Sequence, residues 1–90
     1  MIGPTAAGVG VSGRVQTATG RGLRNATVTI TDAEGNRRTT STGSFGSYRF
    51  DDIEAGKTYV ISVTSQRYRF APRIVNVTDS LTNTDFVGLE

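Results

Sequence analysis

The chain has 90 residues, enough for one domain with a small core, and its 10 basic and 8 acidic residues give a formal net charge of +2. It contains no cysteine and no histidine, which excludes disulfides, thiolate chemistry and the commonest general base near neutral pH. The charges are scattered and no apolar run approaches the ~20 residues of a membrane span, so we expect neither a nucleic-acid partner nor membrane insertion.

The first seven residues, MIGPTAA, predict a flexible N-terminal tail, because they are mostly small and include a proline. We expect one domain over residues 8–88. No basic, then apolar, secretory signal opens the chain, so we expect a module whose parent chain carries any targeting signal.

The first half of the chain alternates between apolar and polar residues, which predicts strands. In residues 9–15 a glycine, Gly13, stands in the middle of the apolar series and indicates close approach of another backbone or a bulge. Residues 26–32 are the clearest strand, with Ala26 on its apolar face and threonines on the other face. A hairpin loop containing Gly35 follows, and the threonine-rich residues 37–43 predict an edge strand.

The second half continues the same alternation. We expect strands at 47–50, 57–65, 67–70, 73–78 and 84–89, with a turn over residues 51–56. Pro72 lacks a backbone donor and predicts a strand start or an edge. The side chains expected to face the core are Tyr48, Phe50, Ile53, Tyr59, Ile61, Val63, Tyr68, Phe70, either Ile74 or Val75, Val77 and Phe86. About seven short strands without a helical period predict an all-β, seven-stranded antiparallel sandwich.

Several glycines and aromatic residues recur in a distinctive order. They are Gly13, Gly22 with Leu23 and Ala26, the triplet Gly46-x-Tyr48-x-Phe50, and Gly56-x-x-Tyr59. Over residues 9–88 this order resembles the carboxypeptidase regulatory-like domain. The resemblance implies a Greek-key sandwich of the prealbumin (transthyretin-like) or Ig-like type. It also implies a non-catalytic accessory module of bacterial secreted or surface proteins, located outside the cell, at its surface or in the periplasm.

The marker residues themselves favour structural roles. In Gly56-x-x-Tyr59 we expect a tyrosine corner, in which the Tyr59 hydroxyl bonds the backbone near residues 53–55 and Gly56 makes the tight exit from the turn. A catalytic role for Tyr59 would need a partner, and none is near in the sequence.

Two groups of acidic residues are weak candidates for a metal site: Asp32 and Glu34, and then Asp51, Asp52 and Glu54. Ca²⁺ takes 6–8 oxygen ligands, so neither group suffices alone, and the two could combine only at the same end of the sandwich. Turn chemistry explains the same residues and is the favoured interpretation. We therefore predict no cofactor and no metal.

A lysine–asparagine isopeptide bond, as in collagen-adhesin B-type domains of distantly similar architecture, would need a lysine in the first strand. The only lysine is Lys57, and the first-strand position holds Arg14 or Val15. Arginine stays protonated and cannot attack an amide, so no crosslink is expected.

The segment Arg67-Tyr68-Arg69-Phe70, with Arg73, resembles a stacking platform for nucleic acid or sugar. Strand parity places Tyr68 and Phe70 toward the core, which favours a solvated arginine face instead. Phe45, in the stretch STGSFGS, is the aromatic residue that parity leaves free. It is the candidate contact for a protein or carbohydrate ligand.

We therefore expect a structural or interaction module, a spacer whose partners are the neighbouring domains of its parent chain. The alternative is a protein- or carbohydrate-binding module that uses the loops near Phe45. No acid–base pair or metal can be assembled from the candidates, so an enzyme is not expected.

Overall fold

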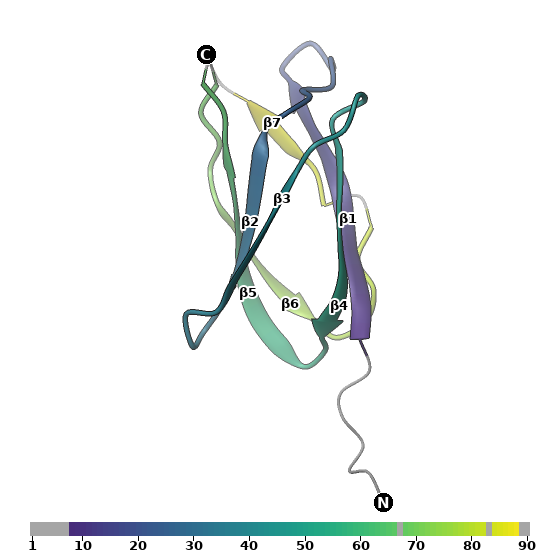
Figure 1. The fold of residues 1–90 in the computed structure, drawn as a ribbon, viewed down its shortest axis with the longest axis vertical. Coiled ribbons are helices and arrows are strands. Elements are labelled where there is room, and N and C mark those ends of the chain that lie inside the picture. Colours follow the sequence, from purple (N-terminus) through teal and green to yellow (C-terminus); the bar gives the residue numbers. More distant parts are fainter. Residues whose placement is uncertain (1–7, 67, 83, 89–90) are drawn as a thin grey trace, which may run out of the picture.

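Two β-sheets pack face to face in the computed structural model, which describes residues 8–66, 68–82 and 84–88 (Figure 1). The strands are β1 (Gly8–Thr17), β2 (Thr27–Asp32), β3 (Arg37–Ser41), β4 (Ser47–Glu54), β5 (Lys57–Thr64), β6 (Arg73–Val77) and β7 (Phe86–Gly88). The described residues contain no helix, so the predicted all-β sandwich is confirmed.

The strand orders are β4-β1-β7 in one sheet and β3-β2-β5-β6 in the other. The chain crosses between sheets from β3 to β4 and again from β4 to β5, and β5 then returns beside β2, which is a Greek-key path. β3 is an edge strand, as its polar sequence predicts.

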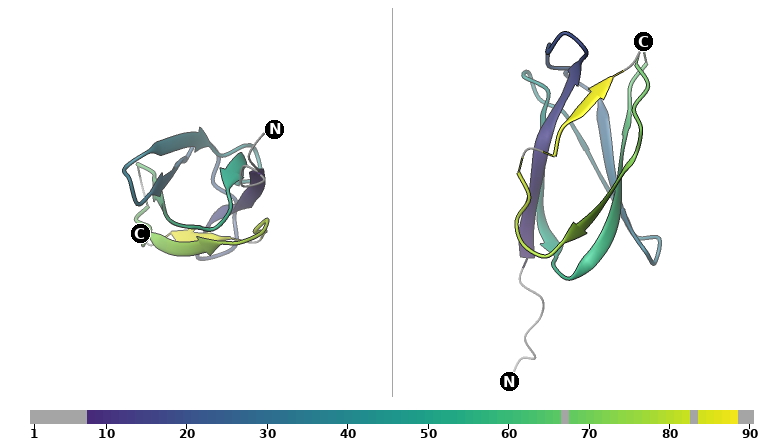
Figure 2. Two further views of the ribbon diagram at one scale, coloured as in Figure 1. Left: turned by 90° about the horizontal axis from the view of Figure 1, so that it is seen from below. Right: turned by 180° about the vertical axis from the view of Figure 1, so that it is seen from behind.

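One strand pair departs from the antiparallel prediction. β1 and β7 are parallel, with Val15 opposite Phe86 and Thr17 opposite Gly88 (Figure 2). The reason lies in the path of the chain: β6 ends near the end of the sandwich where β1 begins, and the following residues run back along β1 before β7 starts. The last strand therefore points in the same direction as the first.

The core lies between the sheets and is filled by the alternating apolar residues. Its fully or nearly buried members are Val11, Val15, Ala26, Val28, Ile30, Tyr48, Phe50, Ile53, Tyr59, Ile61, Val63, Val77 and Phe86. Val75 packs against this core while Ile74 is 75% exposed, which decides between the two residues that the sequence left open. Tyr68 and Phe70 are half-buried, so the predicted inward alternation of 67–70 is only partly realised; Arg67 lies outside the described residues.

β4 continues through residues that the sequence assigned to a turn. It reaches Glu54, so the predicted turn over 51–56 shrinks to the two residues before β5. Opposite Val9 and Val11, β4 carries one extra residue, and Asp52 takes a positive φ of 58° there. Such a bulge changes the parity of the strand, which is why Phe50 and Ile53, three residues apart, both face the core.

Tyr59 lies at the corner between β4 and β5. Its ring is buried, and its hydroxyl donates to the Glu54 carbonyl oxygen at 2.8 Å, within the range of residues that the sequence indicated. Gly56 has a φ of +89° and donates its backbone N–H to the Val77 carbonyl at 2.6 Å, so it ties the corner to the end of β6.

Gly13 is the point of closest approach between β1 and the chain that leads into β7. A Cβ atom at Gly13 would lie 2.0 Å from the Thr84 carbonyl oxygen and 2.4 Å from its carbon. Gly13 also stands opposite Tyr48 in the β1–β4 ladder, and the Tyr48 hydroxyl donates to that same Thr84 carbonyl. Close approach is thus the reason for a glycine here, whereas the bulge lies nearer the start of β1.

We predict that Gly13→Ala destabilises the fold by about 1–3 kcal/mol, because the new methyl group must displace the Thr84 backbone. Thermal unfolding measures the effect, and Gly10→Ala in the same strand is the matched control. A Cβ at Gly10 would meet nothing closer than 3.8 Å. Equal melting temperatures for the two variants would contradict the close-approach role of Gly13.

We also predict that Tyr59→Ala costs about 3–5 kcal/mol, because it empties the volume of a buried ring. Tyr59→Phe keeps the ring and loses only the bond to Glu54, which is worth about 0.5–1.5 kcal/mol. Chemical denaturation of both variants separates the two terms. A Tyr59→Ala protein as stable as the parent would rule out the corner assignment.

Candidate functional site

Phe45 lies in the loop that connects β3 to β4, with its backbone fixed and its side chain exposed. The Arg14 side chain donates to the Phe45 carbonyl at 3.2 Å, and Gly46 closes the turn by donating to the Gly43 carbonyl at 2.9 Å. Gly46 has a φ of +80° and fits tightly against the Val15 carbonyl, so the β3–β4 loop packs against β1. The Phe45 side chain is nevertheless 77% exposed. A rigid support thus presents an apolar ring to solvent.

Two hollows open at the same end of the sandwich, with volumes of about 460 and 620 Å³. Leu23, Arg24 and Tyr68 line both of them, and Arg21 and Ser44 line the smaller one. No acidic residue lines either hollow. We call this region, with Phe45, the Phe45 end. Its arginines, hydroxyls and amides can donate hydrogen bonds, while Phe45 and Tyr68 offer apolar surface.

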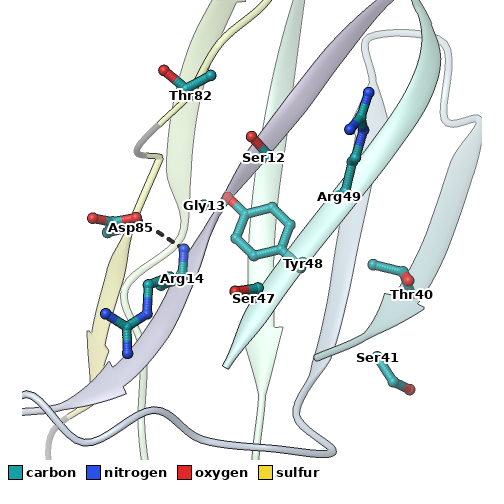
Figure 3. A pocket seen from close by; sticks show the side chains of 10 residues that line it. All are labelled: Ser12, Gly13, Arg14, Thr40, Ser41, Ser47, Tyr48, Arg49, Thr82 and Asp85. Atoms are coloured by element: carbon teal, nitrogen blue, oxygen red, sulfur yellow. Dashed lines mark hydrogen bonds between the residues drawn. The ribbon is translucent and has the colours of Figure 1, made fainter. Parts of the chain in front are cut away.

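A third hollow, of about 550 Å³, is lined by residues of β1, β3 and β4 and of the chain that leads into β7 (Figure 3). Its hydroxyl-bearing side chains are Ser12, Thr40, Ser41, Ser47, Tyr48 and Thr82, and its charged ones are Arg14, Arg49 and Asp85. The charged groups have partners already: Asp85 accepts from the Arg14 backbone at 2.9 Å, and Arg49 pairs with Asp51 at 2.7 Å.

Tyr48 cannot serve as an acid in this third hollow. Burial raises the pKa of Tyr48, and its hydroxyl is engaged with the Thr84 carbonyl. The hollow therefore combines hydroxyl groups and paired charges without a nucleophile and a base in contact, and it offers a polar surface rather than a reaction centre.

The two acidic groups do come to the same end of the sandwich, opposite the Phe45 end, but a lysine stands between them. The Lys57 ammonium contacts Glu34 at 3.2 Å and Glu54 at 3.3 Å. These carboxylates raise the pKa of Lys57, chiefly through the hydrogen bond to Glu34. A cation is thus supplied by the chain itself where a metal would have to bind.

The remaining acidic candidates have other roles. Asp32 accepts backbone N–H groups from Glu34 and Asn36, both at 2.9 Å, which is the turn chemistry expected of it. Asp51 pairs with Arg49, and Asp52 occupies the bulge of β4. No group of three or more potential metal ligands occurs among residues 8–66, 68–82 and 84–88.

Of the predicted platform arginines that the structure describes, Arg73 covers part of the core and Arg69 is exposed. The Arg73 guanidinium lies 5.9 Å from the centre of the Phe86 ring and donates to the Asp85 carbonyl at 2.9 Å. Arg38 covers the Phe50 ring in the same way, again at 5.9 Å. Such cation–π contacts shield ring faces at the rim of a small core.

The sequence reasoning missed an exposed apolar pair. Val60 on β5 stands opposite Ile74 on the edge strand β6, and they are 39% and 75% exposed. A usable signal was present: Val77 is an inward residue, so alternation assigns Val75 to the core and Ile74 to solvent.

The part of the chain that the structure describes has no helix, and therefore none long and apolar enough to cross a membrane. The residues considered for a lysine–asparagine crosslink lie apart in the sheet structure. Lys57 lies at the start of β5, whereas β1 carries Arg14, which is exposed, and Val15, which is buried.

Comparisons with known proteins agree with this architecture. A model of the carboxypeptidase regulatory-like domain matches residues 10–87. Among solved structures, the Bacillus anthracis TIE protein is similar, with a TM-score of 0.71 at 15% sequence identity. The alignment covers 90% of this chain but only 16% of the other, and at this identity the likeness concerns the fold alone. No curated protein matches the sequence.

The Asp32 turn gives a pH prediction. The hydrogen bond from the Asn36 side chain is the main cause that holds the pKa of Asp32 below its usual 3.8. A lowered folded-state pKa stabilises the fold above the unfolded pKa, and this contribution is lost as pH falls through the lowered value. We expect Asp32→Ala to melt below the parent protein at pH 7, and the difference to narrow as pH falls through the lowered pKa, because the parent then loses the carboxylate charge but keeps acceptor oxygens.

Asp32→Asn is the control for this prediction, because it keeps an acceptor oxygen and removes the titration. Its melting temperature should lack the part of the acid dependence that belongs to Asp32. A constant difference between Asp32→Ala and the parent protein from pH 7 to pH 2 would show that the turn does not depend on the carboxylate charge.

Proposed function

The chain belongs to the carboxypeptidase regulatory-like domain family, and on this premise we propose that it is a non-catalytic accessory module, a β-sandwich spacer within a larger bacterial secreted or cell-surface protein. Its partners are then the neighbouring domains of its parent chain. The proposal includes no cofactor and no nucleic-acid partner.

The observation that carries the proposal is the placement of the first and last strands. β1 begins at one end of the sandwich and β7 finishes toward the other, because the two strands are parallel (Figure 1). A domain entered at one end and left at the other separates its neighbours by its own length. The ten residues of β1 alone span about 33 Å at the usual rise of 3.3 Å per residue.

The chemistry of the surface supports a non-catalytic role. In the described part of the chain, four of the five acidic candidates are engaged with Lys57, Arg49 or backbone donors; they are Asp32, Glu34, Asp51 and Glu54. Every buried side-chain nitrogen and oxygen there has a hydrogen-bond partner, so none is held in reserve for a substrate.

The second candidate function is the binding of a protein or carbohydrate at the Phe45 end. It is favoured by one observation: Phe45 is exposed although its backbone is fixed by Arg14 and by the turn between Gly43 and Gly46. An ordered aromatic ring beside hydrogen-bond donors is a common element of ligand sites.

Thermal unfolding with Ca²⁺, with EDTA and with a panel of soluble polysaccharides tests the two candidates. A ligand present at 100 times its Kd adds about 2.7 kcal/mol, which raises the melting temperature of a domain this small by several degrees. A melting temperature that no addition changes supports the spacer function. A melting temperature raised by one polysaccharide would contradict the spacer and support the binding module.

We predict that Phe45→Ala changes the free energy of unfolding by no more than about 0.5 kcal/mol, because the Phe45 side chain is mostly exposed. The melting temperature should therefore change little. If a ligand does shift the melt, the same variant should abolish that shift. Ile74→Ala is the matched control, since it removes a similarly exposed apolar side chain elsewhere. A ligand shift that survives in Phe45→Ala would exclude the Phe45 end as the binding site.

A further inference from the structure

The end of the chain runs along β1 over most of that strand. Residues 80–82 and 84–88, here called the C-terminal segment, contact β1 through a series of backbone bonds. Leu81 donates to Gly10 at 2.9 Å, Ser12 donates to Leu81 at 2.9 Å, and Thr84 donates to Ser12 at 3.0 Å. The β1–β7 ladder then continues the parallel pairing from Val15 to Thr17.

Side chains strengthen the same contact. The Ser80 hydroxyl accepts from Gly10, the Asp85 carboxylate accepts from Arg14, and the Tyr48 hydroxyl donates to Thr84. These bonds link sequence positions that lie 36 to 71 residues apart. The first two join β1 to the last described residues of the domain and the third joins β4 to them, all within the same sheet.

The fit at Gly13 resists sliding of the two strands. The Thr84 backbone occupies the space that any side chain at Gly13 would fill. The next residues of β1 on the same face are Val11 and Val15, which are fully buried. Movement of Thr84 along β1 in either direction therefore meets a valine side chain, so the register is fixed sterically as well as by hydrogen bonds.

The direction of load follows from the parallel arrangement. Tension between the chain ends pulls the start of β1 and the end of β7 in opposite directions, along the strands (Figure 2). The bonds between β1 and the C-terminal segment lie across that direction, so they are strained together rather than one after another. On its other side β1 pairs with β4 from Gly8 to Arg14, and that ladder is sheared as well.

We propose that this domain is a tension-bearing link, in which the C-terminal segment and β1 form a shear clamp that opposes unfolding when the chain is pulled from its two ends. The proposal deepens the spacer function and rests on it for its biological setting. The mechanical resistance itself is a property of the 90-residue chain.

Single-molecule force spectroscopy on the 90-residue protein tests the clamp by comparing two pulling directions. The sequence has no cysteine, so introduced cysteines are unique attachment points. In one arrangement the handles are attached at the two chain ends. In the other, one handle is at the N-terminus and one is at Thr78→Cys, an exposed position just after β6 at the end where β1 begins. This second direction peels β1 from the C-terminal segment bond by bond.

We expect the end-to-end direction to need about twofold or more the unfolding force of the peeling direction at equal loading rate, because shared load raises the barrier that governs forced unfolding. The two proteins have the same fold and nearly the same free energy of unfolding, so a difference between their unfolding forces reflects the pulling direction. Equal forces, or a weaker end-to-end direction, would overturn the clamp.

A pair of conservative variants locates the resistance. Tyr48→Phe and Tyr59→Phe each remove a hydroxyl that donates to a backbone carbonyl, but only Tyr48 bonds the C-terminal segment. We expect Tyr48→Phe to lower the end-to-end force clearly more than Tyr59→Phe does. Equal losses would mean that force follows general stability and would count against the clamp. The force experiments contain no ligand, so a negative result would reject the clamp without deciding the spacer function. The thermal unfolding with added ligands tests that function separately.

Discussion

The contact of the Thr84 backbone with Gly13, under the Tyr48 hydroxyl, is the constraint on which the rest of the sandwich depends. It allows the C-terminal segment to close one side of β1 while β4 closes the other. Tyr48 also packs edge-on against Phe50, with ring centres 6.0 Å apart, and lies 6.2 Å from Phe86. The absence of a side chain at Gly13 thus makes room for the bond from Tyr48 to Thr84 and for the approach of the C-terminal segment to β1. The aromatic rings of Tyr48, Phe50 and Phe86 pack together beside this contact.

Local pattern was sufficient for much of this fold. β5 illustrates why: Tyr59, Ile61 and Val63 alternate with outward residues because one face of the strand meets the core and the other meets solvent. The bulge at Asp52 was not predictable in this way, since two adjacent aspartates resemble a turn and only pairing with β1 keeps them in a strand. The parallel direction of β7 was hidden for a related reason, because it depends on the path of the whole chain and not on three residues of sequence.

The candidate site also combines features that local sequence predicts with features that depend on long-range contacts. Parity alone singles out Phe45, because it follows from the residues beside it, and the structure places that ring in solvent. The contact of Lys57 with Glu34 and Glu54 joins two separate turns, so no sequence spacing encodes it. The sequence showed that the two acidic groups could combine only at the same end of the sandwich, and the structure brings Glu34 and Glu54 together there. What the sequence could not give is that the only lysine of the chain occupies the space between them.

The pairing of the first strand with the last residues also sets the order in which the domain can form. β1 leaves the ribosome first, yet its partner on one side is made only when residue 88 has been added. Bonds such as Arg14 to Asp85 close loops of about seventy residues, and contacts of such long range slow folding toward the millisecond-to-second regime. Until then β1 has an open edge that can pair with another chain. Synthesis of β7, rather than of the earlier core strands alone, is therefore the step that closes the second side of β1.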